Sequence, residues 1–451
     1  MCKLRLLMAI GVLLLMRINI YAQESQKMYL SIDNLYDLIE TNNKELKTAK
    51  TARNVAQQDY NVAQSNRLPD LNVSATVSYN GNATIMDRDF TNSMSAQTPH
   101  LGNSVMVNLY QPIYSGGAIT GNINLAKSQS QMADIAIDNT RDNMKIAVIS
   151  CYLNLFKCRN LLKVYDENII LTEKLIQNMH SSNEQGIVLK NDITRYELRL
   201  STLKFDRTTI ENNIKVLNYN ICSHLSLNPS IEIIPDSTII NQLLPIDGVE
   251  YWKNLSQNNS LRLKTIHTQQ DILKQSDKIT RSEYLPHVGI VASNTLEGPI
   301  TYEVPPIDKN INYWWVGINV SYNISSLFKT NKKTLRNKLE LTRLSEHLSA
   351  TSEDLNREIE QAYILYTQAH QQLSTQLKNV ELATENYRIV DKRFNNQLAL
   401  LTDMLDASTA KLDAETRLIN AKINTIYYYY QLKFISSTLL LIKKTYVCYK
   451  T

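Results

Sequence analysis

Glycine and proline are scarce in this sequence: its 451 residues include only 11 Gly and 10 Pro. Both residue types interrupt regular secondary structure, so their scarcity excludes a loop-rich enzyme and predicts long, uninterrupted elements. A large excess of one charge is also missing, because the formal net charge is only +5. A charge so small and so evenly spread argues against a nucleic-acid partner.

Catalytic and metal-binding signatures are missing as well. The seven histidines are scattered, and none lies in a His-Glu-x-x-His motif or at the helical spacing of two ligands with a third partner. The sequence has neither a phosphate-binding glycine loop nor a Gly-x-Ser-x-Gly elbow. Cys151 and Cys158, seven residues apart, are interpreted as small buried residues of a helix. We therefore predict no enzyme activity, no cofactor and no metal site.

The N-terminus has the features of a secretory signal peptide. Lys3 and Arg5 precede an apolar run at residues 6–16, and Ala22 offers a small residue before a cut at Gln23. We predict that residues 1–22 are removed. No later stretch reaches 18 apolar residues, so the exported protein is expected either to be soluble outside the cytoplasm or to cross a membrane as β-structure.

The most informative feature of the sequence is an internal duplication. Three segments of the first half align with three of the second: residues 42–48 with 259–265, 67–69 with 284–286, and 107–109 with 318–320. The offset is 217 for the first two pairs and 211 for the third. The difference falls in a polar stretch, residues 81–103, where a loop would tolerate it. We predict two structural repeats, residues 23–235 and 236–442, followed by a tail at 443–451.

Each repeat begins with a helical segment, residues 32–66 or 249–283, that ends before a proline. Two strands follow, because apolar and small polar residues alternate at residues 71–80 and 104–109 and again at 288–293 and 316–323. A small polar face suits a water-filled lumen and an apolar face suits lipid, although a soluble sandwich has the same pattern.

Four strands are too few to close a membrane barrel, so several chains would have to contribute strands. The adjacent aromatic residues Tyr313, Trp314 and Trp315 at the start of a strand are expected at the rim of the membrane.

After the second strand, each repeat is expected to form a helix of unusual length, over residues 117–182 and 329–395, and to return over 189–227 and 402–441. About 65 helical residues span about 100 Å, which excludes packing around one compact core. Apolar and small residues recur at alternating spacings of four and three, the heptad pattern of helices that coil in pairs. These positions are Met144, Val148, Cys151, Leu155, Cys158, Leu162, Tyr165, Ile169, Thr172, Ile176 and Met179, and Ile359, Ala362, Tyr366, Ala369, Leu373, Gln376, Val380, Ala383, Tyr387 and Val390.

The turns between the long helices, residues 183–192 and 394–406, contain acidic residues at similar places. Asp192 and Asp403 each follow a short apolar turn and are predicted to N-cap the returning helix. Asp406 is placed three residues into its helix, where a carboxylate interacts favourably with the helix dipole.

Over residues 30–440 the chain resembles the TolC-like outer-membrane efflux proteins. The resemblance rests on the duplicated order of elements, on Tyr-Gln-Pro-Ile-Tyr-Ser-Gly-Gly at residues 110–117, and on residues 393–407 around the second turn. It implies a mainly α chain with a small β part: duplicated long coiled helical hairpins plus four transmembrane strands. Three such chains would form a 12-stranded barrel in the outer membrane and an α-helical tunnel through the periplasm.

The resemblance also assigns roles to residues of the turns. Asp403 and Asp406 match an acidic ring that, with Phe394, gates the closed end of the tunnel. The tips that face a periplasmic adaptor correspond to six residues: Gly186, Ile187, Val188, Leu398, Ala399 and Leu400.

The function implied is that of an outer-membrane channel, with a periplasmic helical extension, that serves a tripartite efflux system. Its partners would be two further copies of the chain, the adaptor, an inner-membrane pump and outer-membrane lipid. Two alternatives stay open: the outer-membrane conduit of a type I protein secretion system, and a secreted coiled-coil interaction or adaptor protein.

Overall fold

The computed structural model describes residues 27–238, 244–303, 305–396 and 398–439. The predicted signal peptide (1–22) and the predicted tail (443–451) lie outside the described residues. The chain divides into two compact units. The first consists of Met1–Lys47, Asn139–Ser260 and Leu355–Thr451, and the second of Thr48–Asp138 and Leu261–Asp354.

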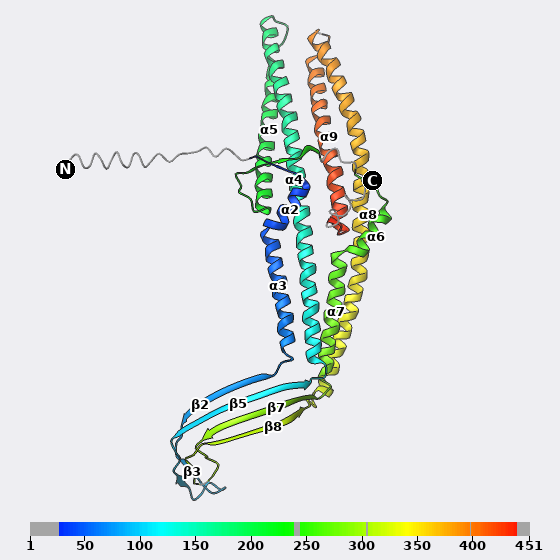
Figure 1. The fold of residues 1–451 in the computed structure, drawn as a ribbon. Coiled ribbons are helices and arrows are strands. Elements are labelled where there is room, and N and C mark those ends of the chain that lie inside the picture. The colour runs from blue at the N-terminus through cyan, green and yellow to red at the C-terminus, as the bar shows by residue number, and fades with distance from the viewer. Residues whose placement is uncertain (1–26, 239–243, 304, 397, 440–451) are drawn as a thin grey trace, which may run out of the picture. The chain divides into compact units, whose positions relative to one another are not determined.

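The order of the main elements is the same in both halves of the chain (Figure 1). The first half contains α2 (Ile32–Asn42), α3 (Lys44–Ser65), β2 (Asp70–Tyr79), β5 (Leu101–Tyr114), α4 (Ala118–Glu184) and α5 (Lys190–His224). The second contains α6 (Val249–Asn259), α7 (Leu261–Ser282), β7 (His287–Gly298), β8 (Ile311–Ser321), α8 (Ser326–Asn395) and α9 (Leu401–Ile435). Four short strands complete the described elements: β1 (Lys27–Leu30), β3 (Ala83–Ile85), β4 (Met94–Ala96) and β6 (Glu232–Pro235).

The helical segment predicted at the start of each repeat is confirmed, but each segment forms two helices, which are separated at Asn43 and Ser260. Asn43 accounts for the first break. Its Oδ1 accepts a hydrogen bond from Leu46 N at 2.8 Å, so it N-caps α3, while its Nδ2 donates to the carbonyl of His224 at 2.8 Å. The capping side chain satisfies a backbone N–H at the break and so stabilises the start of α3.

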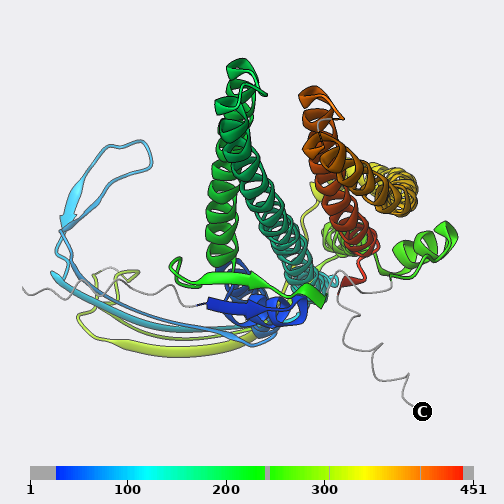
Figure 2. The same ribbon diagram turned by 90° about the horizontal axis from the view of Figure 1, so that it is seen from above.

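The second unit contains a four-stranded antiparallel sheet in the order β2-β5-β7-β8, and the strands bend in one direction (Figure 2). All four strands were predicted from the two-residue period. The register places Leu71 beside Leu109, Leu109 beside Ala292, and Ala292 beside Val316, so one face is apolar across the sheet. Leu71, Val316 and most of the other apolar side chains of this face are exposed in the single chain.

The opposite face of the sheet is mainly small and polar. Its central row joins Asn72, Asn108, Ser293 and Trp315. Alternation therefore separates the three aromatic residues that were predicted to form one rim. Trp314 lies on the apolar face, opposite Asn294, whereas Tyr313 and Trp315 lie on the polar face. The prediction treated adjacent residues as a cluster, although neighbours along a strand point to opposite faces.

The two long helices, each of which begins in the second unit and continues into the first, have about the predicted lengths, with 67 residues in α4 and 70 in α8. Within residues 371–390 the half-buried side chains are those of the six predicted heptad positions, and all the others are exposed. The predicted seam is therefore the surface that packs. The two helical hairpins contact each other through Ile169, Leu203 and Leu412, which form one buried cluster from α4, α5 and α9.

A small parallel sheet in the first unit was not predicted. β1 pairs with β6, and both strands end at Tyr152 of α4. The Tyr152 hydroxyl donates to the Leu30 carbonyl at 2.7 Å and accepts from the Asp236 N–H at 2.9 Å. Strands of four residues carry too short a pattern for the two-residue period to reveal. The hairpin β3–β4, which lies within the stretch predicted as a loop, was not predicted either, for the same reason.

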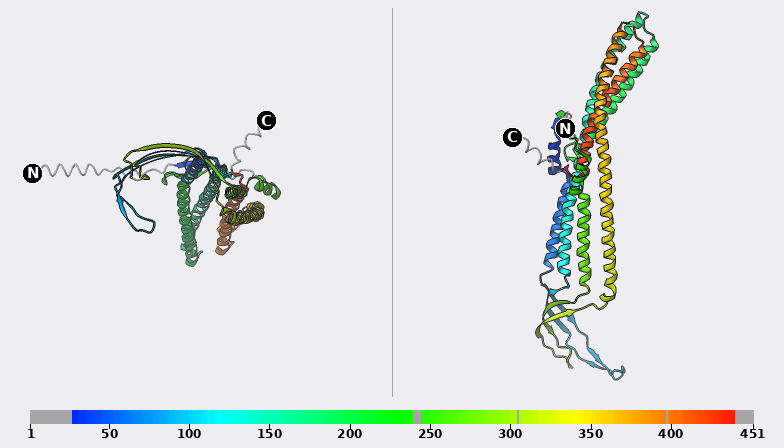
Figure 3. Two further views of the ribbon diagram at one scale, coloured as in Figure 1. Left: turned by 90° about the horizontal axis from the view of Figure 1, so that it is seen from below. Right: turned by 90° about the vertical axis from the view of Figure 1, so that its right-hand side faces the viewer.

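Both helical hairpins of the first unit end in short turns that lie close together (Figure 3). In the part of the chain that the structure describes, no helix is apolar enough over a sufficient length to cross a membrane.

Candidate functional site

The first turn, between α4 and α5, is built around Gly186. This residue has a φ of +74°, in the left-handed region that favours glycine. Gly186 N donates to the Asn183 carbonyl at 2.9 Å, and Ile187 N to the Ser182 carbonyl at 3.0 Å, which satisfies the end of α4. The turn leaves the Ile187 side chain 53% exposed, whereas Val188 is half-buried.

The second turn, between α8 and α9, is closed by hydrogen bonds of the backbone and side chain of Arg393. Leu398 N donates to the Arg393 carbonyl at 2.7 Å, and Arg393 Nη2 donates to the Leu398 carbonyl at 3.1 Å. The side chains of Leu398 and Leu400 are 68% and 70% exposed. With Ile187 and Leu189 of the first turn, four large aliphatic side chains at the two turns are exposed to water, which is unusual without a partner.

The structure brings most of the predicted site residues together. A cleft of about 320 Å³ lies between the two turns and is lined by Ile187, Val188, Asp192, Phe394, Ala399 and Leu400, among others. Below it, Ile176, Met179, Ile193 and Tyr196 of the first hairpin form a buried cluster with Leu401 and Leu405 of the second. This apolar contact holds the two turns side by side.

The two predicted N-caps are wrong in position. α5 begins at Lys190 with Leu189 at the N-cap, and α9 begins at Leu401 with Leu400 at the N-cap. Asp192 and Asp403 therefore both lie in the first turn of their helices. Asp403 still completes its helix, because Leu400 N donates to its Oδ2 at 3.0 Å. Both helices start three residues earlier than N-caps at Asp192 and Asp403 would place them.

The acidic residues of the second turn face water. Asp403 and Asp406 are both exposed, one helical turn apart on α9. The two acidic side chains therefore lie together on the solvent-facing side of α9 near its start. Groups of three or more residues able to hold a metal ion do not occur among the described residues.

Three residues beside the acidic pair were not predicted as site residues. The Tyr196 hydroxyl is buried and has no hydrogen-bond partner among the described residues. Burial raises the pKa of this phenol, and the nearby Tyr387 and Asp406 add to the effect. A cavity of about 20 Å³, large enough for one water, lies between Tyr196, Tyr387 and Lys411. Only the heptad position of Tyr387 could have indicated this from the sequence.

Long paired helical hairpins joined to a four-stranded sheet with an exposed apolar face define the class of outer-membrane channel subunits. The description "Outer membrane efflux protein" belongs to the family whose model matches residues 35–195 and 252–434, more than half of the chain. The chain therefore belongs to the outer membrane efflux protein family. It is an outer-membrane channel protein of efflux systems, and the predicted resemblance is confirmed.

Individual relatives agree with this assignment. Outer membrane protein TolC of Salmonella enteritidis is 18% identical over 421 residues, which are 90% of this chain and 81% of TolC. The fold is similar to that of VceC from Vibrio cholerae, with a TM-score of 0.76 at 12% identity over 90% of this chain and 96% of VceC. It is also similar to the CmeC channel of Campylobacter jejuni, with a TM-score of 0.73 at 14% identity over 90% of this chain and 85% of CmeC.

Proposed function

We propose that three copies of this chain form the outer-membrane conduit of a tripartite efflux system. The observation that carries the proposal is the sheet. Within the described residues, β2 and β8 each pair on one side only, so the sheet has two open edges. If β8 of each chain pairs with β2 of the next, three sheets form a ring of 12 strands with no open edge. Twelve strands are enough to close a membrane barrel, whereas the four strands of one chain are too few.

In this barrel the apolar face of the sheet contacts lipid and the small polar face lines the lumen. The two predicted repeats, residues 23–235 and 236–442, each supply two strands and one helical hairpin to the conduit. The chain acts as a passage and not as an enzyme, in keeping with a transport family.

The contacts proposed for a periplasmic adaptor, which in turn holds an inner-membrane pump, are the six tip residues Gly186, Ile187, Val188, Leu398, Ala399 and Leu400. Ile187, Leu398 and Leu400 are the most exposed large side chains among them, whereas Val188 is half-buried and also packs against the buried cluster below the cleft.

Asp403 and Asp406, with Phe394 in the neighbouring cleft, form the proposed gate. Around a threefold axis six carboxylates converge, and like charges about 6 Å apart repel by roughly 2–3 kcal/mol per pair at an effective dielectric of about 20. A closed state then requires protons, a bound cation or compensating hydrogen-bond donors. The conduit is therefore expected to select cations and to be blocked by multivalent cations from this end.

The test is single-channel recording of the double variant Asp403→Asn/Asp406→Asn in planar bilayers. Asparagine removes the charge but keeps a side-chain oxygen for the Leu400 N–H, so the start of α9 is preserved. We expect cation selectivity and block by trivalent cations to weaken strongly. A matched control is Asp413→Asn/Glu415→Asn, which removes two charges elsewhere on α9 and is expected to change neither property. Unchanged selectivity and block in the first variant would remove these residues from the gate.

A further inference from the structure

The polar face of the four-stranded sheet carries three large aromatic side chains. Tyr110 lies on β5, and Tyr313 and Trp315 lie on β8, with exposed fractions of 39%, 43% and 49%. The register places them on the same face as Asn72, Asn108 and Ser293. Exposed rings on a face made mainly of small polar residues require a reason, because such rings are usually buried or at a membrane rim.

Two of these rings lie over glycines. A Cβ built on Gly289 would be 2.5 Å from Cε2 of Tyr110, and a Cβ built on Gly317 would be 3.6 Å from Cζ3 of Trp315. Each ring thus leans over backbone that lacks a side chain, and its remaining surface stays exposed. Tyr110 and Trp315 are two strands apart, or about 10 Å. They form two supports for a flat molecule of that length.

The charge of this sheet has one sign. Its four strands contain two carboxylates, Asp70 and Glu297, and one histidine, His287, but no lysine or arginine. Both carboxylates lie on the polar face, and Tyr313 Oη donates to Glu297 Oε1 at 3.4 Å. Aromatic rings and carboxylates both attract cations, and the sheet offers no fixed positive charge to oppose them.

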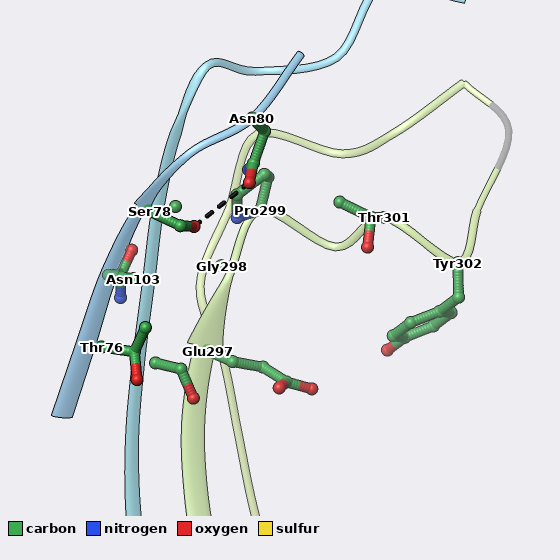
Figure 4. Close-up of a pocket in the computed structure, with 11 residues that line it drawn as sticks. Thr76, Ser78, Asn80, Asn103, Glu297, Gly298, Pro299, Thr301 and Tyr302 are labelled. Carbon is green, nitrogen blue, oxygen red and sulfur yellow. Dashed lines mark hydrogen bonds between the residues drawn. The ribbon is translucent and has the colours of Figure 1, made fainter. Parts of the chain in front are cut away.

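A polar cleft continues the same surface beyond the rings. It has a volume of about 210 Å³ and is lined by Thr76, Ser78, Asn80 and Glu297, among others (Figure 4). Glu297 belongs to both regions, since it bonds to Tyr313 and also lines this cleft. A ligand that stacks on Tyr313 and the neighbouring Trp315 can therefore place its charge near Glu297 and its polar edge against hydroxyls and amides.

We propose that the polar face of the sheet is a binding site for planar organic cations, formed by Tyr110, Trp315 and Tyr313 with the carboxylates Glu297 and Asp70. This inference rests on the proposed function, in which the polar face lines the lumen, and it assigns a substrate class to the conduit. Ring stacking and cation–π attraction would hold the ligand, and Glu297 would balance its charge.

The test measures equilibrium binding of proflavine, a planar cation, to the detergent-solubilised protein by fluorescence anisotropy. Trp315→Leu is expected to weaken binding about tenfold, as the loss of one stacked ring implies. The matched control is Trp314→Leu, the adjacent residue on the apolar face, which should leave binding unchanged. Glu297→Gln keeps the shape and removes the charge, and it should also weaken binding. If Trp315→Leu does not assemble, proflavine binding by Glu297→Gln decides the test.

Two results would overturn the inference: equal binding by wild type, Trp315→Leu and Glu297→Gln, or equally tight binding of the planar anion fluorescein or of neutral maltotriose. Assembly and conductance of the same preparations separate this failure from a failure of the proposed function. A trimer that conducts salt but binds no proflavine removes only the inference. A protein that neither assembles nor conducts removes the proposed function as well.

Discussion

Single polar side chains complete the backbone at the points where helices break, turn or meet strands. Asn43 caps α3 and also bonds to the His224 carbonyl, Asp403 accepts the N–H of Leu400, and Arg393 closes the second turn. Each satisfies a backbone group that would otherwise be left without a partner at a helix end. Because glycine is scarce in this chain, side-chain hydrogen bonds stabilise helix ends that a glycine turn would stabilise in other proteins.

One half-buried histidine makes the stability of the first unit depend on pH. His370 on α8 packs edge-on against Tyr366, with ring centroids 4.7 Å apart, and burial lowers its pKa below the usual value of 6.5. The unfolded chain therefore binds a proton that the folded chain resists, so the stability present above about pH 6.5 is lost as the pH falls through that value towards the folded pKa.

We predict that the melting temperature of the wild-type protein falls between about pH 8 and about pH 5, and that His370→Gln reduces this fall. Differential scanning calorimetry at the two pH values checks the prediction. The control is His180→Gln, which changes an exposed histidine on α4 and should leave the fall as it is in wild type. An equal fall in His370→Gln and wild type would show that other groups cause it.

At the scale of elements, the repeat of apolar residues decides what packs, and it could be predicted from the sequence. The heptad positions of α8 and the two-residue period of β2, β5, β7 and β8 both lie where the sequence placed them. The breaks at Asn43 and Ser260 could not be predicted, since each depends on long-range contacts or on a single residue. β1 and β6 were missed because four residues hold almost no pattern.

The small β1–β6 sheet depends on one hydroxyl. Tyr152 is fully buried and bonds to backbone groups at the ends of both strands. We predict that Tyr152→Phe lowers the free energy of unfolding by about 1 kcal/mol, because it removes the hydroxyl from two hydrogen bonds while the Asp236 N–H still donates to the Leu30 carbonyl at 3.1 Å. Denaturant unfolding measures the change. Tyr165→Phe, on the same helix and partly exposed, should have little effect, and an equal loss in both variants would contradict the prediction.

For the whole molecule, the open edges of the sheet and its exposed apolar face both indicate that a single chain is incomplete in water. Strand pairing between copies would satisfy the edges, and membrane lipid would cover the apolar face. The candidate site was partly predictable in the same way. The turn residues could be placed by the duplication and the resemblance, whereas Tyr196 could not, because its burial depends on contacts between the two hairpins.

Adjacent residues of β2 test which face meets lipid. Val73 lies on the apolar face and Ser74 on the polar face. We predict that Val73→Lys destabilises the inserted protein by about 2–4 kcal/mol, the effect of lysine at the middle of a bilayer, while Ser74→Lys is tolerated. Outer-membrane yield of the folded protein, measured by resistance to denaturation in the gel, separates the two. Equal yields would mean that the apolar face does not contact lipid.

The central claim is that this chain is one third of a membrane channel. Native mass spectrometry of the mature protein released from detergent micelles tests it most directly. The account predicts a species with the mass of three chains and no stable protein without detergent. A single chain that stays dissolved in detergent-free buffer would contradict the account.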